Sequence, residues 1–179
     1  MVDNKKYPVI QRGNVKEVFL AVCVKTRLYL KIDLKSKKAN RSAMMWIIAK
    51  FGVHKLPYSC TVYSDGCGSM IPVSKVVVQT GLNHVFIPPY EQSLNEAEQV
   101  CDKGFAVART LLTRANAPDS LMWAALDMAL YTHNRMSTTK LRGYKTPYEM
   151  VYGSKPSITH MRPFWTRAFA HVPKDWAAE

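Results

Sequence analysis

The order of strand-like and helix-like segments is the feature that most constrains this chain. Residues 16–24 and 27–33 are rich in β-branched and aromatic side chains and are separated by a short polar turn, which predicts two paired strands. The opening segment around Asp3 can pair beside them as a third strand. From about Ser36 to Phe51 apolar residues recur at helical spacing, which predicts the first helix.

Strands and helices alternate in the segments that follow. A short apolar strand is expected at 60–64, and it leads into a loop of small residues that begins at Asp65. The pattern then predicts a helix over 72–80, a strand over 84–87, and helices over 92–116 and 120–135. This order favours an α/β fold in which helices cover the faces of a mixed sheet.

The length and charge of the chain limit its organisation and its partners. We expect one domain over residues 1–136 and a loop-rich C-terminal extension over 137–179. Lys and Arg number 25 against 13 Asp and Glu, so the formal net charge is +12. Such an excess favours a polyanionic partner such as nucleic acid. The alternative is a basic protein whose charge serves only its solubility.

Cysteine, histidine and apolar residues carry three further expectations. No apolar run is long enough to span a bilayer, so we expect no membrane partner and an intracellular location, in the cytoplasm and nucleus. The four cysteines form no Cys-x-x-Cys pair, which fits reduced thiols. The five histidines are scattered, and we therefore expect no structural zinc site.

Three acidic residues stand out by their positions. Asp3 lies on the first expected strand, Asp65 at the end of the fourth, and Glu98 in the first turns of the long helix. Mg²⁺ prefers oxygen ligands, and converging carboxylates can hold two ions about 4 Å apart for phosphoryl transfer. Each acid alone is more often a solvated surface residue, and Glu98 also suits a helix N-terminus. The three together predict a Mg²⁺ or Mn²⁺ site.

Several segments in the same order resemble the catalytic core of a copia-type retrotransposon integrase. TVYSDGCGSM at 61–70 is similar to the strand-end motif of the second catalytic acid, and GLNHVFIPPYEQSLNEAEQ at 81–99 to the stretch that carries the third. The segments at 108–136 and 146–164 resemble the Ala-Arg-x-Leu-Leu, Asn-Arg, Thr-Pro-Tyr-Glu and His-x-Arg sequences that follow. The resemblance implies a ribonuclease H-like fold with a mixed five-stranded sheet flanked by helices.

The resemblance also implies a function and its residues. The implied enzyme is a DDE-type polynucleotidyl transferase and endonuclease. It would carry out DNA integration for a transposable element, by metal-dependent 3′-end processing and strand transfer. Asp3, Asp65 and Glu98 take the catalytic and metal-binding roles. The partners are the element ends and target DNA, bound by a homo-oligomer. Lys and Arg side chains are candidate contacts to the DNA backbone, although each is more often just a solvated charge: Lys5, Lys6, Arg12, Lys103 and Arg109.

The chain departs from the family pattern at each acid. Gly66 and Cys67 stand where the family has Asn-Gly, and Glu98 follows Asn95 one position early. A helix turns about 100° per residue, so this shift re-aims the carboxylate unless the helix start adjusts. The Gly-Pro that follows the first acid appears only as Tyr7-Pro8, which leaves Asp33 as the fallback for Asp3.

Three other expectations follow from the same comparison. The zinc module that precedes complete integrase cores is missing, because only two residues precede Asp3, and we expect a fragment or a degraded copy. Trp123 and Tyr131 match the family but are expected to pack in the core. The alternative functions are an inactive remnant that still binds nucleic acid, and a ribonuclease H-like nuclease that cleaves RNA in a hybrid.

Overall fold

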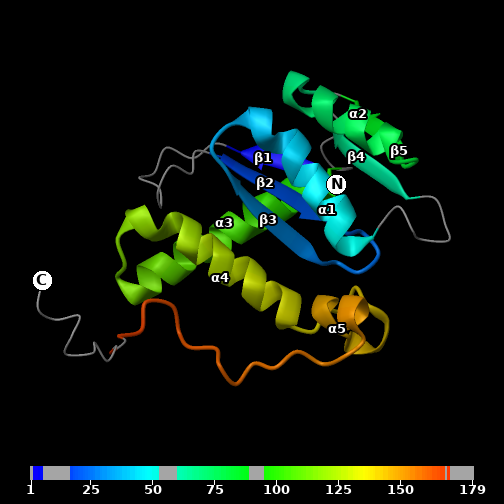
Figure 1. Ribbon diagram of the computed structural model, residues 1–179. Helices are drawn as coiled ribbons and strands as arrows, with labels where there is room; N and C mark the ends of the chain where they lie inside the picture. The colour runs from blue at the N-terminus through cyan, green and yellow to red at the C-terminus, as the bar shows by residue number, and fades with distance from the viewer. Residues whose placement is uncertain (1, 6–16, 53–59, 89–94, 168, 170–179) are drawn as a thin grey trace, which may run out of the picture.

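The structure is a computed structural model that describes residues 2–5, 17–52, 60–88, 95–167 and 169. These residues contain five strands, five α-helices and several 3₁₀ turns (Figure 1). The strands are β1 (Val2–Lys5), β2 (Glu17–Val22), β3 (Tyr29–Leu34), β4 (Thr61–Asp65) and β5 (Asn83–Ile87). The helices are α1 (Asn40–Phe51), α2 (Ile71–Gln79), α3 (Glu96–Ala115), α4 (Met122–Arg135) and α5 (Pro147–Tyr152).

The strands lie in the order β3-β2-β1-β4-β5 and form two parts. In one part β1, β2 and β3 pair antiparallel, with Asp3 opposite Leu20 and Leu20 opposite Lys31. In the other part β4 and β5 pair in parallel along their full length. A single parallel pair, Val2 with Ser64, links β1 to β4 and so joins the two parts.

Alternation along the strands assigns the apolar side chains to two cores. Phe19 and Ala21 of β2 belong to one buried cluster together with residues of α1 and α2. Val18, Leu20 and Val22 belong to the other, which the residues of α3 and α4 complete. Because successive strand residues face opposite sides, this split places α1 and α2 on one face and α3 and α4 on the other.

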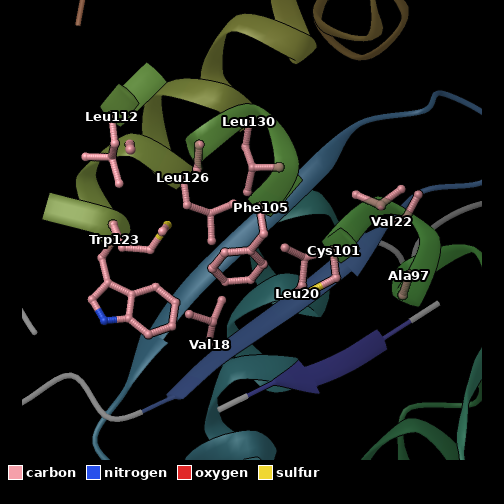
Figure 2. Close-up of a cluster of buried hydrophobic side chains, with 14 residues drawn as sticks. Val18, Leu20, Val22, Ala97, Cys101, Phe105, Leu112, Trp123, Leu126 and Leu130 are labelled. Atoms are coloured by element: carbon pink, nitrogen blue, oxygen red, sulfur yellow. The ribbon is translucent and has the colours of Figure 1, made fainter. Parts of the chain in front are cut away.

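The core between the sheet and α3 and α4 positions the long helix (Figure 2). Ala97, Cys101 and Phe105 of α3 pack toward Leu20 and Val22 of β2. The Phe105 ring meets the Trp123 ring of α4 edge to face at 5.9 Å between centroids. Gly104 brings the two helices close together, since a Cβ there would lie 3.1 Å from Leu126 Cδ1. Trp123 is 2% exposed, which confirms its expected place in the core.

Most of the expected elements are present, and the mixed α/β class is confirmed. The strand predicted over 84–87 runs from Asn83 to Ile87, and the helix predicted over 92–116 is described from Glu96 to Ala115. The loop-rich prediction after residue 136 missed α5, whose start is capped by the Thr146 side chain accepting from the Glu149 amide. α5 packs against α4.

Asn134 joins the end of α4 to the start of β3. Its Oδ1 accepts from the Tyr29 amide at 2.8 Å, and its Nδ2 donates to the Tyr29 carbonyl at 2.8 Å. The side chain thus satisfies both backbone groups of an edge-strand residue as a neighbouring strand would. The next residue, Arg135, lies over the Tyr131 ring at 3.4 Å and the Tyr148 ring of α5 at 5.0 Å. The Asn-Arg motif therefore has a structural role in this chain.

We predict that Asn134→Ala lowers the free energy of unfolding by about 1–3 kcal/mol, because two half-buried backbone groups of Tyr29 lose their partner. Urea unfolding measures the change. Asn134→Asp keeps the acceptor, so its free energy of unfolding should lie between those of the native chain and Asn134→Ala. As a control, Thr113→Ala at an exposed position should change the free energy of unfolding by less than about 0.5 kcal/mol. Equal stabilities of Asn134→Ala and the native chain would contradict a clamping role.

His133 stacks on Tyr29 beside this clamp. The two rings are 3.9 Å apart and nearly parallel, at 4°. The His133 Nε2 atom is buried and has no hydrogen-bond partner within the described residues. Burial lowers the pKa of His133 below 6.5, and the nearby Lys103 charge lowers the pKa further. The folded state therefore favours the neutral imidazole.

We predict that stability falls as the pH drops below about 6.5, because the unfolded chain then binds a proton that the half-buried His133 resists. The stabilising contribution of neutral His133 is fully present above about pH 6.5. It is lost progressively as the pH falls to the lowered pKa of His133 in the folded state. Chemical unfolding at pH 7.5 and 5.5 tests this dependence. His133→Phe keeps a stacking ring but has no titrating group, so it should reduce the pH dependence of the free energy of unfolding. An unchanged slope in this variant would assign the effect elsewhere, for example to His84, whose pKa burial also lowers.

Candidate metal and nucleic-acid site

Asp65 lies at the carboxyl end of β4, where the strand turns into the loop that precedes α2. Its Oδ1 atom is buried and accepts no hydrogen bond within the described residues. A buried carboxylate oxygen without a partner is costly, and such an atom commonly marks a site for an ion or a ligand. Asp65 is therefore the best-supported residue of the expected set.

The loop after Asp65 leaves open space around the backbone. Neither Gly66 nor Gly68 has a positive φ, and a Cβ built on either would meet no atom within 4 Å. The protein itself therefore does not require glycine at these positions. A hydrogen bond connects the loop to α1, because the buried Asn40 at the start of α1 donates to the Ser69 carbonyl at 3.4 Å.

Asp3 lies on β1, for which the backbone register gives the position. Val2 pairs with Ser64 of β4, so Asp3 and Asp65 are the next residues along two neighbouring parallel strands. Asp3 also pairs with Leu20, a residue of the core formed with α3 and α4. Since cross-strand partners share a face, Asp3 and Asp65 both belong to the face that carries α3.

Glu98 lies in the first turn of α3, on the same side of the sheet. Its backbone amide is bound by the helix N-cap, because the buried Asn95 accepts from it through Oδ1 at 3.3 Å. Its side chain is half-buried. α3 packs against β1 and β2, which places this turn on the face that Asp3 and Asp65 share.

The carboxylates fit a divalent metal in their chemistry. Carboxylate oxygens are the ligands that Mg²⁺ prefers, and Asp65 has an oxygen free to bind one. Within the described side chains, no group of three His, Cys, Asp or Glu residues is close enough to hold an ion. The backbone register brings Asp3 and Asp65 into adjacent positions. The site of three acids remains a prediction.

Asp33 and Glu96 lie elsewhere. Asp33, the fallback for Asp3, belongs to the outer strand β3 and forms an ion pair with Lys31 at 2.7 Å. Strands β2 and β1 separate β3 from β4, which puts Asp33 about 14 Å from β4 at the usual strand spacing. The fallback was wrong for this reason. Glu96 forms an ion pair with Arg27, as expected for an acid that points away from the site.

Three of the five candidate DNA contacts lie on described elements, β1 and α3. Lys5 ends β1, close in the chain to Asp3, while Lys6 and Arg12 lie outside the described residues. Lys103 and Arg109 are exposed on α3. Lys103 lies close enough to His133 to affect its pKa. Arg109 lines a shallow pocket of about 300 Å³ with residues of the C-terminal half of α3 and with Asp119.

An exposed apolar strip beside Asp65 was not expected from the sequence. Tyr63 and Val85 pair across β4 and β5, and they are 38% and 43% exposed. Tyr63 is two residues before Asp65 and therefore lies on the same face. The period-two pattern of TVYSD contained this signal, because it already placed Tyr63 and Asp65 together.

None of the described helices combines the length and the apolar character that crossing a bilayer requires.

No protein-family model matches the chain, but individual proteins are similar to it. It is 25% identical over 159 residues to the retrovirus-related Pol polyprotein from transposon RE1 of Arabidopsis thaliana, and 26% identical to that from transposon RE2. Each match spans 88% of this chain and 9% of the polyprotein. The polyprotein from transposon TNT 1-94 of Nicotiana tabacum is 30% identical over 89 residues, which are 50% of this chain and 7% of that protein.

A solved structure supports the fold. A chain of the simian T-cell lymphotropic virus intasome, solved in complex with the PP2A regulatory subunit B56 gamma, superposes with a TM-score of 0.63 at 16% identity. The match covers 93% of this chain and 59% of that one. The homologues of this chain are therefore retrovirus-related Pol polyproteins of transposons, in agreement with the copia-type integrase core that its motifs resemble.

Proposed function

We propose that this chain is the ribonuclease H-like catalytic core of a retrotransposon integrase, which cleaves and joins DNA with the help of Mg²⁺ or Mn²⁺. The observation that carries the proposal is the register that sets Asp3 beside Asp65, together with the buried, unpartnered Oδ1 of Asp65. An α/β fold that needed Asp65 only for stability would be expected to satisfy this atom with a hydrogen bond.

Asp3, Asp65 and Glu98 would hold the metal ions. When bound, the ions activate the attacking oxygen and stabilise the leaving oxygen of a phosphodiester. The residues of the chain would supply the geometry: the pairing of β1 with β4 would position the first two acids, and the N-capped start of α3 would position the third. Glu98 can approach from the α3 side because that helix packs on β1 and β2.

The surface around Asp65 suits a DNA strand. The net charge of +12 favours phosphate binding, and Gly66 and Gly68 leave room for a backbone to approach. Tyr63 offers an exposed ring on the same face, on which a base can stack. DNA partners and a homo-oligomeric assembly are part of the proposal, as is the assignment of the motifs to DNA integration within the element.

A second candidate is an integrase-derived remnant that binds nucleic acid without catalysis. The early position of Glu98 after Asn95 favours this alternative, because a shortened helix start can misplace the third acid. Both candidates predict DNA binding, and only the first predicts metal-dependent joining.

We predict Mg²⁺- or Mn²⁺-dependent cleavage and joining of a labelled DNA duplex by the native chain, and a loss of at least about 100-fold in Asp65→Asn, because the metal loses a charged ligand. Asp33→Asn is the matched control, since it removes an exposed strand carboxylate far from β4 and should retain activity. DNA binding by each protein is measured in parallel. Binding without activity in the native chain would select the remnant.

We predict that substitution of a basic residue that binds a DNA phosphate lowers the salt dependence of DNA binding. The slope of log K against log salt should fall by about 1 for each phosphate that the variant no longer neutralises. Lys103→Gln and Arg109→Gln test the two described helix residues separately, by fluorescence anisotropy at several salt concentrations. An unchanged slope in a variant would identify that residue as a solvated charge.

A further inference from the structure

An ion pair links the turn between β2 and β3 to the start of α3. Arg27 in this turn donates through its Nη1 atom to Glu96 Oε2. The two side chains are 22% and 27% exposed, so the pair is largely shielded from water. Arg27 also has a left-handed backbone, with φ of 60°, and its amide donates to the Cys23 carbonyl at 2.7 Å. The backbone of Arg27 is therefore held in a closed turn.

The pair fixes one flank of α3. Ala97 is fully buried and faces the sheet, and its neighbours Glu96 and Glu98 lie about 100° to either side of it around the helix. Glu96 is on the flank that meets the β2–β3 turn. Glu98 is consequently on the opposite flank, which faces away from β3.

The strand order shows which strands the Glu98 flank of α3 faces. α3 packs over β2 and β1, and beyond β1 lies β4. The helix runs along β2, because Ala97 lies near Val22 and Cys101 near Leu20 (Figure 2). Its two flanks therefore face sideways across the sheet, one toward β3 and the other toward β1 and β4. The side of β1 and β4 is where Asp3 and Asp65 lie in adjacent register.

We propose that the Arg27–Glu96 ion pair is a positioning device that sets the rotation of the first turn of α3, so that Glu98 faces Asp3 and Asp65. The proposal rests on the proposed metal site. It also accounts for the early position of Glu98 after Asn95: the N-cap of Asn95 binds the Glu98 amide, and the ion pair holds the turn on its other side. In this proposal Arg27 and Glu96 are positioning residues, which act on the site through the placement of Glu98.

A charge-reversal cycle tests the device. Arg27→Glu and Glu96→Arg each place like charges together, and the double variant restores an ion pair of opposite polarity. Mn²⁺ affinity, measured by electron paramagnetic resonance, should fall about tenfold or more in each single variant and recover to within about threefold in the double variant. Asp127→Asn is the control, because it breaks the Lys31–Asp127 ion pair between β3 and α4, away from the α3 start, and should leave Mn²⁺ affinity unchanged.

A second readout separates this proposal from the proposed function. The Glu98 amide reports the first turn directly, because it donates to Asn95. Its hydrogen exchange and chemical shift should change in both single variants and return in the double variant, whether or not a metal binds. A native chain that binds no more Mn²⁺ than Asp65→Asn, yet shows this amide pattern, would refute the metal site and retain the positioning role. Single variants whose Glu98 amide matches the native chain would overturn the positioning role.

Discussion

The pairing of β1 between β2 and β4 is the interaction on which the arrangement of this molecule depends. The antiparallel part and the parallel part of the sheet meet at the pair of Val2 with Ser64. A slip of one residue at this junction would turn Asp3 or Asp65 to the opposite face of the sheet. The short strand β1 thus determines both the continuity of the sheet and the neighbourhood of the candidate acids.

The helix α3 serves both the core and the site. Its buried stripe packs on β2 and α4, while its first turn presents Glu96 and Glu98 on opposite flanks. Packing fixes where the helix lies, but it restrains rotation at a helix end weakly, because only Ala97 is buried in the first turn. Polar contacts at Asn95 and Arg27 supply the restraint that apolar packing lacks.

Local patterns in the sequence predicted most of the elements and supplied the candidate acids. The β-branched and aromatic content of 16–24 and the helical pattern of 92–116 depend on neighbours along the chain, and both were readable without a structure. The ion pair of Arg27 with Glu96 joins residues 69 positions apart, and the clamp of Asn134 on Tyr29 joins residues 105 apart. The periodicity of a sequence cannot predict contacts between residues so far apart in the chain. Asp33 was a plausible fallback because strand order, which removes it from β4, is a long-range property.

The Asn134 clamp also limits how the gene can change. Trp123 and Asn134 are eleven residues apart, about three helical turns, so both face the rest of the fold from one side of α4. Inserting or deleting a single codon between them would rotate the amide by about 100° and separate it from Tyr29. The length of α4 is thus a fixed spacer, whereas the exposed stretch around Ser154 and Lys155 can change in length without disturbing either anchor.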